Sequence, residues 1–340
     1  MTDALPTPEA ELDVVTRLLV DNPRNLAALL RKGRALERLG REAEAVGAYD
    51  GALAVAPPFW QLTPGLQAEV RHAHESAQSW HERRDAFLRE RLADQLGKRE
   101  TRRFEQSLDV LGGRRTVYRQ QPHQFFFPEL PCIEFYDPDD FPWLQAIVDA
   151  TPAIRDEFLA VHAVDSGFEP YIAYPDGAPL DQWTELNRNP RWSAFHLLRD
   201  GKPVQPNADR CPRTMAALQG APQPMLQGRT PTAMFSLLKP RTRIPPHTGV
   251  TNARLVVHIP LIVPDKCLYR VGGQSRPWRV GEPLIFDDSI EHEAWNDSDE
   301  SRTVLIFDIW NPFIAEAERA LVASLYEALD AFGGTAAGWS

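Results

Sequence analysis

The spacing of apolar and polar positions divides the chain into two parts. From residue 9 to about 110, apolar residues recur at three and four positions with charges between them, which is the period of amphipathic helices. After residue 121, prolines and aromatic clusters become frequent, and one more helical stretch follows near 141–162. From 231 onward, short β-branched runs alternate with turn residues, and a last helical stretch covers 313–332. We therefore expect a helical domain over 1–118 and a strand-rich domain over 119–340.

Runs with the length and composition of strands recur in the second domain: AMFSLL (233–238), ARLVVHIPLIV (253–263), CLYRV (267–271), EPLIFDD (282–288) and RTVLIFDIW (302–310). Turn sequences such as PDK and GGQS separate them. Many short strands joined by tight turns are typical of an antiparallel jelly roll. The predicted fold class is α+β: a double-stranded β-helix core, jelly-roll or cupin-like, with an α-helical N-terminal domain.

One segment of the helical domain, residues 25–57, matches the tetratricopeptide pattern of small and large residues. The matching positions are Gly33, Leu36, Ala45, Tyr49, Ala52 and Pro57. Small residues let two antiparallel helices approach, and larger residues fill the groove between them. A single repeat offers little concave surface, which favours a structural cap. A surface that binds a protein partner or makes a dimer is the second interpretation.

Charge and composition narrow the choice of partners and compartment. The chain has 47 acidic and 37 basic residues, a formal net charge of −10, which opposes non-specific binding to nucleic acid or to anionic membranes. The first residues have neither a basic start nor an apolar core, and no window is long and apolar enough for a membrane span. We expect a cytoplasmic protein whose substrate is a peptide or a small molecule. The three cysteines lie far apart and indicate neither a disulfide framework nor a metal knuckle.

Histidines and arginines gather in the strand-rich segment. His247 precedes a predicted strand, His258 lies within one, and His292 follows the strand that ends at Asp287–Asp288. A lone histidine is usually a satisfied polar residue, but two on different strands of a jelly roll can converge on one metal ion and leave its other positions open. Arg302 begins a strand, and an arginine directed into the core requires a carboxylate partner such as a dicarboxylate cosubstrate.

The segments HTGVTNARLVVHIPL, LIFDDSIEHEAWNDS and SRTVLIFDIWNP resemble the aspartyl/asparaginyl β-hydroxylase family of Fe(II)- and 2-oxoglutarate-dependent dioxygenases. The resemblance implies that Fe(II), 2-oxoglutarate and O2 are used to hydroxylate an unactivated C–H bond, such as the β-carbon of an Asp/Asn-type residue or a related substrate. It makes His247 and His292 the iron ligands. It assigns the far carboxylate of 2-oxoglutarate to Arg302 and Ser236, and the end that chelates iron to His258.

The third protein ligand of the common two-histidine, one-carboxylate site is absent, because Gly249 stands at its place. The resemblance allows water there, which gives a hydroxylase, or a halide, which gives a halogenase. We favour water held by Asp288, because a nearby carboxylate would accept its hydrogen bonds and repel chloride.

One departure concerns the substrate. Animal peptide hydroxylases of the family carry an additional arginine where this chain has Val256, and Arg254 on the same strand face is a candidate replacement. Candidate substrate contacts are the blocks 169–177 and 186–201, although ordinary core packing explains their aromatic residues equally well. A different class also stays open: a metal-free degenerate barrel that binds a ligand while the helical domain recruits protein partners.

Overall fold

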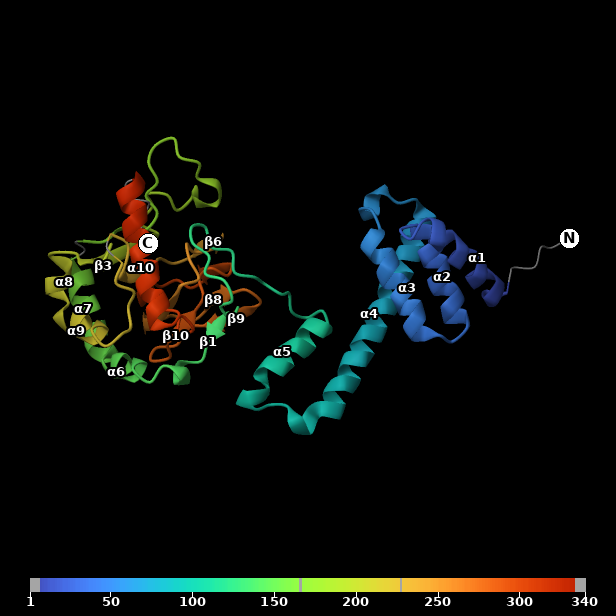
Figure 1. The fold of residues 1–340 in the computed structure, drawn as a ribbon, viewed down its shortest axis with the longest axis horizontal. Helices are drawn as coiled ribbons and strands as arrows, with labels where there is room; N and C mark the ends of the chain where they lie inside the picture. Colours follow the sequence, from blue (N-terminus) through green and yellow to red (C-terminus); the bar gives the residue numbers. More distant parts are fainter. Residues whose placement is uncertain (1–6, 165–166, 227, 334–340) are drawn as a thin grey trace. The chain divides into compact units, whose positions relative to one another are not determined.

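The computed structural model describes residues 7–164, 167–226 and 228–333, and the chain divides into two compact units, 1–115 and 116–340 (Figure 1). None of the described helices combines the length and the apolar character that crossing a bilayer requires. All three cysteines are free thiols, with Cys132 exposed and Cys211 and Cys267 buried.

The first unit is helical throughout. Its α-helices are α1 (Pro8–Asp21), α2 (Leu26–Arg38), α3 (Glu42–Val55), α4 (Pro64–Leu92) and α5 (Arg102–Leu111). Asn25 caps α2 by accepting a hydrogen bond from the Ala28 amide at 3.0 Å. Gly33 on α2 lies against the ring of Tyr49 on α3, so closely that an added Cβ would fall within 3.0 Å of ring atoms. The small-against-large contact expected between these helices is present, while the tetratricopeptide assignment stays a prediction.

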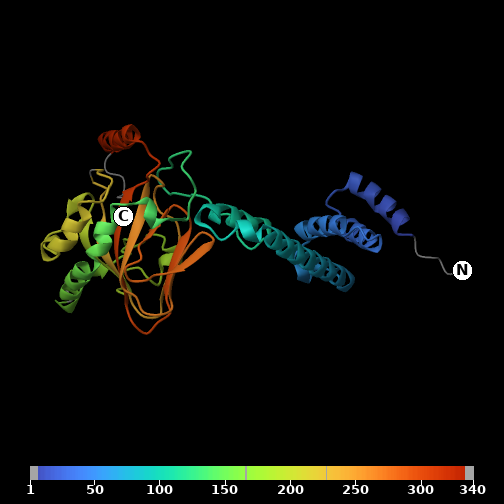
Figure 2. The same ribbon diagram turned by 90° about the horizontal axis from the view of Figure 1, so that it is seen from below.

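The second unit combines helices with two antiparallel sheets (Figures 1 and 2). Its helices are α6 (Leu144–Asp149), α7 (Thr151–Val164), α8 (Asn207–Arg210), α9 (Pro212–Leu218) and α10 (Glu316–Gly333). Its strands are β1 (Phe135–Tyr136), β2 (Glu169–Pro170), β3 (Trp192–Arg199), β4 (Lys202–Pro203), β5 (Ala233–Leu238), β6 (Thr242–His247), β7 (Arg254–Ile262), β8 (Cys267–Val271), β9 (Gln274–Pro277), β10 (Leu284–Phe286), β11 (His292–Asn296) and β12 (Arg302–Trp310).

The larger sheet has the order β1-β10-β7-β12-β5-β3-β2, with β4 pairing β3, and the smaller sheet has the order β6-β11-β8-β9. One face of the larger sheet packs on α6, α7 and α9, which lie together beside the strands in Figures 1 and 2. The other face meets the smaller sheet in a second apolar core. This is an α+β fold with a jelly-roll-like core.

Alternation along β12 shows how the two cores share one strand. Leu305, Phe307 and Ile309 face the helices, whereas Val304 and Ile306 face the smaller sheet. Because both faces are covered, the strand is a nearly continuous apolar run rather than an alternation of apolar and polar residues. Polar side chains on its inner face, Arg302 and Asp308, are therefore buried.

Several expectations about elements need correction. His292 follows β10 as expected, but it also begins β11, a strand that was not expected. His247 ends β6, which contains two prolines and was not expected either. β6 lies at the edge of the smaller sheet, where missing amide donors are tolerated. The run expected to be a strand over 282–288 is shorter in the structure: only β10 is a strand, Glu282 makes an isolated bridge to Arg279, and the chain turns at Asp288. The helix expected near 141–162 is two helices, α6 and α7.

Candidate active site

The two predicted metal ligands lie opposite each other on adjacent strands of the smaller sheet. His247 and His292 are register partners, and their ring centroids are 4.0 Å apart. His247 Nδ1 lies 2.8 Å from the Pro245 carbonyl and His292 Nδ1 lies 3.0 Å from the Ile290 carbonyl. A carbonyl only accepts, so each Nδ1 carries the proton and each Nε2 keeps its lone pair. Both rings therefore present the atom that binds a metal.

The protonation of these rings supports the same role. Burial, with the neighbouring His292 ring, lowers the pKa of His247 to about 3, and burial lowers the pKa of His292 to about 4. Both imidazoles are neutral at pH 7, the form that ligates a metal. Within 7–164, 167–226 and 228–333, no group of three or more His, Cys, Asp or Glu side chains has the arrangement of a metal site. The pair thus fits an ion that keeps most of its positions for exogenous ligands.

The structure shows what lies beside Gly249, at the place of a third protein ligand. The Gly249 amide donates to the Asp288 carbonyl at 2.6 Å. An added Cβ at this glycine would fall within 3.0 Å of all three terminal atoms of the Asp288 side chain, Cγ, Oδ1 and Oδ2. The space that a side chain at 249 would need is occupied by the carboxylate of Asp288, which lies in the connection between β10 and β11. The expected vacancy beside Gly249 is therefore filled in part by Asp288.

The two neighbouring aspartates have different partners. Asp287 is fully buried and accepts hydrogen bonds from the Ser289 amide, the Ser289 hydroxyl and Gln120, so its carboxylate fixes the turn. Asp288 faces the cavity, and Arg254 donates to its Oδ2 at 3.1 Å. Burial raises the pKa of Asp288, although the positive charge of Arg254 opposes the shift. Only Asp288 is placed to act on groups near the histidines.

The residues predicted to bind the cosubstrate lie at one end of the same cavity. Arg302 is 1% exposed, its Nε and Nη1 have no hydrogen-bond partner among the described residues, and burial lowers its pKa to about 10. Its guanidinium lies over the ring of Trp278 at 4.5 Å, and Trp278 Nε1 donates to His258 Nδ1 at 3.2 Å. The Ser236 hydroxyl accepts from Trp192 Nε1 at 3.2 Å.

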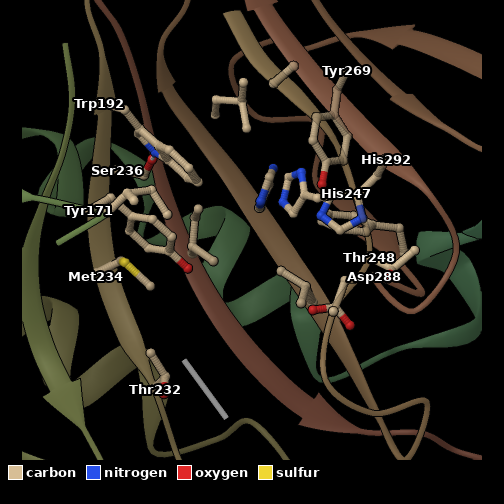
Figure 3. Close-up of a pocket in the computed structure, with 18 of the residues that line it drawn as sticks. Tyr171, Trp192, Thr232, Met234, Ser236, His247, Thr248, Tyr269, Asp288 and His292 are labelled. Atoms are coloured by element: carbon tan, nitrogen blue, oxygen red, sulfur yellow. Dashed lines mark hydrogen bonds between the residues drawn. The ribbon is translucent and has the colours of Figure 1, made fainter. Parts of the chain in front are cut away.

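These groups share a cavity of about 270 Å³ (Figure 3). The six predicted site residues all line it: Ser236, His247, His258, Asp288, His292 and Arg302. Figure 3 shows Trp192, Ser236, Met234 and Thr232 along one side, with His247, His292 and Asp288 across from them. The arrangement places His247 and His292 between a deep cationic end and an opposite polar end.

The two blocks expected to contact substrate divide between the cavity and the core. Tyr171 and Tyr174 line the cavity, and so does Trp192. Phe195 instead is fully buried in the core between the larger sheet and the helices, so the packing interpretation holds for it. The second block was not recognised as strand β3, whose residues Trp192 to Leu198 are all buried.

Cavity residues that the sequence interpretation did not single out include Tyr269, Trp278, Thr232 and Asp308. Asp308 had a usable signal, because it lies six residues after Arg302 on one strand and even spacings share a face. Trp278 follows β9, outside every run that was expected to be a strand, and only the fold brings it to His258.

Comparison with known proteins agrees with this geometry. Residues 149–312 match the family profile described as Aspartyl/Asparaginyl beta-hydroxylase. The ornithine lipid ester-linked acyl 2-hydroxylase of Rhizobium tropici is 39% identical over 185 residues, 54% of this chain and 62% of that protein. Human aspartyl/asparaginyl beta-hydroxylase is 34% identical over 167 residues, 49% of this chain and 21% of its own length. These matches show that the chain is similar to the aspartyl/asparaginyl β-hydroxylase family.

The family similarity has a limited extent. Aspartate beta-hydroxylase domain-containing protein 2 of Xenopus tropicalis is 30% identical over 213 residues, 61% of this chain and 55% of that protein. The chain thus spans less than two thirds of each of these relatives.

Solved structures add a weaker likeness. A Cupin 2 conserved barrel domain protein from Salinispora arenicola has a TM-score of 0.25 and 14% identity, with 45% of this chain and 98% of that chain covered. The jelly-roll-like assignment rests on the sheet topology described above.

Proposed function

We propose that this chain is a hydroxylase that uses Fe(II), 2-oxoglutarate and O2 to oxidise an unactivated C–H bond of a substrate held in the same cavity. Arg302 is the observation that carries the proposal. Its guanidinium is 1% exposed, lines the cavity with both histidines, and has no carboxylate partner among the described residues. A buried charge without a partner is strongly disfavoured, and a dicarboxylate that enters the cavity would supply the partner.

The residues present fit these groups. His247 and His292 would hold the metal through Nε2, since each Nδ1 already donates to a backbone carbonyl. Arg302 would pair with the far carboxylate of 2-oxoglutarate beside the Ser236 hydroxyl, and His258 would contact the end nearer the metal. When bound, iron and the cosubstrate together supply the oxidising power for the C–H bond. The protein positions the reacting carbon and excludes water from the cavity.

Asp288 would hold a water molecule at the position that a third protein ligand otherwise takes. Its carboxylate lies where a side chain at Gly249 would be, and Arg254 orients it. The same negative charge would repel a halide, so we favour hydroxylation over halogenation. In Asp288→Ala we expect a loss of succinate formation of at least tenfold, measured with and without chloride. A chlorinated product, or wild-type activity that requires chloride, would contradict this assignment.

Two substrate classes follow from the relatives. Aspartyl/asparaginyl beta-hydroxylase, by its name, acts on Asp/Asn-type residues, and the Rhizobium relative, by its name, hydroxylates an ester-linked acyl group at carbon 2. We propose the β-carbon of an Asp/Asn-type residue or a related substrate. The acyl group is the second candidate, which the 39% identity to the acyl 2-hydroxylase favours.

The decisive experiment separates an enzyme from a metal-free binding module. The purified chain is given Fe(II), 2-oxoglutarate and O2, and succinate release and bound iron are measured. We expect slow succinate release by the wild type and loss of bound iron in His247→Ala and His292→Ala. Arg302→Ala is the matched variant, which should keep iron while losing 2-oxoglutarate binding. A folded wild-type chain that neither retains iron nor releases succinate would refute the enzyme.

For the helical unit we propose a tetratricopeptide-like hairpin formed by α2 and α3. The close contact of Gly33 with Tyr49 supports this packing. Its role as a structural cap is our first interpretation, and binding of a protein partner is the second.

A further inference from the structure

The inner faces of three strands carry two groups of polar residues along the cavity. The first group is Ser236, His258 and Arg302, the proposed cosubstrate end. The second group is Thr232, Arg254 and Asp308, which also line the cavity. Asp308 accepts a hydrogen bond from the Thr232 amide and lies 3.8 Å from Arg254, so we call these three residues the second polar layer. The proposed function uses Arg254 only to orient Asp288, and it leaves Thr232 and Asp308 without a role.

The second polar layer holds buried acceptors that lack partners. Asp308 is 1% exposed; its Oδ1 accepts from the Thr232 amide at 3.0 Å, while its Oδ2 has no hydrogen bond from any described residue. The Thr232 hydroxyl is also buried and has no hydrogen-bond partner in the described part of the chain. Buried acceptors without hydrogen bonds are disfavoured unless a bound group satisfies them. Both residues line the cavity, so a bound molecule can reach them.

The charges around this layer disfavour an anion. Arg254 donates to Asp288 at 3.1 Å, and its Nη1 lies 3.8 Å from Asp308 Oδ2, so one guanidinium faces two carboxylates. Val256, the next residue on the same face of β7, brings no second positive charge. Arg302 is six residues from Asp308 along β12, roughly 20 Å at the rise of a strand. A carboxylate entering this layer would be the third negative group in a buried site.

We propose that Thr232, Arg254 and Asp308 form a subsite for an uncharged amide group of the substrate. An amide matches the layer, because its N–H groups donate to Asp308 Oδ2 and to the Thr232 hydroxyl while its carbonyl accepts from Arg254. The subsite rests on the proposed function, which places the substrate in this cavity. It selects amide-bearing substrates, an Asn-type side chain or a peptide bond, over a free Asp-type carboxylate.

Matched small probes test the subsite without turnover. Butyramide and butyrate have the same size and differ in the charge of one group. Their binding to the full chain at pH 7.5 is measured by the fluorescence of Trp183 and Trp192, which line the cavity. Saturating 2-oxoglutarate is present, and the Arg302→Ala variant is measured in parallel, so that butyrate bound at Arg302 is not counted. We expect butyramide to bind at least tenfold more tightly than butyrate.

Two variants separate the subsite from a structural role. Asp308→Asn removes the negative charge and should weaken butyramide at least threefold while strengthening butyrate. Val256→Arg should reverse the preference, because it adds a guanidinium on the face of β7 that carries Arg254. A merely structural Asp308 would not make butyrate bind better. Thermal unfolding of each variant checks that it is folded.

Two outcomes overturn the subsite: butyrate binding as tightly as butyramide in the wild type, or no binding of butyramide at all. An unchanged preference in Asp308→Asn and Val256→Arg together also overturns it. These outcomes are independent of succinate release, so failure of the enzyme assay and failure of the subsite are distinguishable.

Discussion

Two buried arginines of the second unit, Arg229 and Arg302, have similar surroundings, but their pKa values are shifted in opposite directions. Arg229 and Arg302 are each 1% exposed, and each guanidinium lies 4.5 Å from the centre of an aromatic ring, Tyr326 for the first and Trp278 for the second. Arg229 makes two hydrogen bonds to Asp330 of α10, at 2.8 and 2.6 Å, and this pairing raises its pKa. Burial lowers the pKa of Arg302 to about 10, because no carboxylate faces it among the described residues.

The difference distinguishes a structural arginine from a binding arginine. Arg229 has its anion within the chain and joins the C-terminal helix to the segment before β5. Arg302 retains donors for an anion that arrives from solution. Burial alone does not identify a functional arginine; the presence or absence of its counter-ion does.

The largest effect is expected at Arg302. Arg302→Ala should weaken 2-oxoglutarate binding by about 2–5 kcal/mol, since it removes one side of a shielded charge pair. Calorimetric titration of the iron-loaded chain measures this, and iron affinity should change far less. Arg302→Lys keeps a charge but not the two-pronged donor, and should recover part of the loss. Unchanged dependence on 2-oxoglutarate would remove Arg302 from the site.

At Arg229 the expected effect is on stability. Arg229→Ala should lower the free energy of unfolding, because it breaks a partly buried ion pair and removes packing against Tyr326. Denaturant unfolding without cosubstrate measures it, with Arg302→Ala as the control, which should lose little stability. If both variants lose the same stability, the contrast between the two arginines fails.

A similar contrast exists between two aspartates, Asp308 and Asp330, whose pKa values are shifted in opposite directions. Burial raises the pKa of Asp308 to about 6 from an ordinary 3.8, so the folded state takes up a proton that the unfolded state releases. This contribution to stability is present below pH 3.8 and is lost as the pH rises through 6. Asp308→Asn cannot titrate, so its stability relative to the wild type should increase by about 2 kcal/mol between pH 4 and pH 7.

Unfolding curves at several pH values give this slope for Asp308→Asn. Asp330, whose hydrogen bonds from Arg229 lower its pKa, is the control. Relative to the wild type, Asp330→Asn should show the opposite trend, with its loss of stability shrinking as the pH falls. A flat difference for Asp308→Asn would show that its proton is not taken up on folding.

The smallest effect concerns the aromatic rings under the two guanidinium groups. Trp278→Phe removes the hydrogen bond to His258 and weakens the cation–π contact with Arg302, so 2-oxoglutarate binding should weaken by about 1 kcal/mol. Tyr326→Phe makes a comparable change under Arg229 and should leave 2-oxoglutarate binding unaltered. If the two substitutions weakened 2-oxoglutarate binding equally, the effect of Trp278→Phe would not come from its contact with Arg302.

The central strands were predictable because both of their faces are covered. The runs expected at 233–238 and 302–310 coincide with β5 and β12, and β7 lies within the run expected at 253–263. Strands β6 and β11 were not found, because TRIPPH contains two prolines and HEAWN has only two apolar residues, which are adjacent and so give no strand-like alternation. Their pairing depends on contacts between distant segments, which local composition does not report.

The sequence predicted which residues form the site but not which of them bind one another. The order of histidines and arginines along the chain identified residues that the fold brings to one cavity. The sequence did not show which of Asp287 and Asp288 faces that cavity, because the answer depends on Gln120 and Ser289 binding the first and Arg254 binding the second. The sequence interpretation treated Asp308 as part of an apolar strand. Only the structure shows that the Thr232 amide donates to its Oδ1, whereas its Oδ2 has no hydrogen bond from the described residues.

The contact between Gly249 and Asp288 also constrains how such a site can evolve. A mutation that restores a carboxylate at 249 introduces it into space that another carboxylate already fills, and a mutation that removes Asp288 first leaves Arg254 without its partner. We expect each single step to be harmful and the double change to be sterically acceptable. The two positions would then be epistatic, and a lineage with this pair would have to cross a fitness valley to reach the three-ligand arrangement.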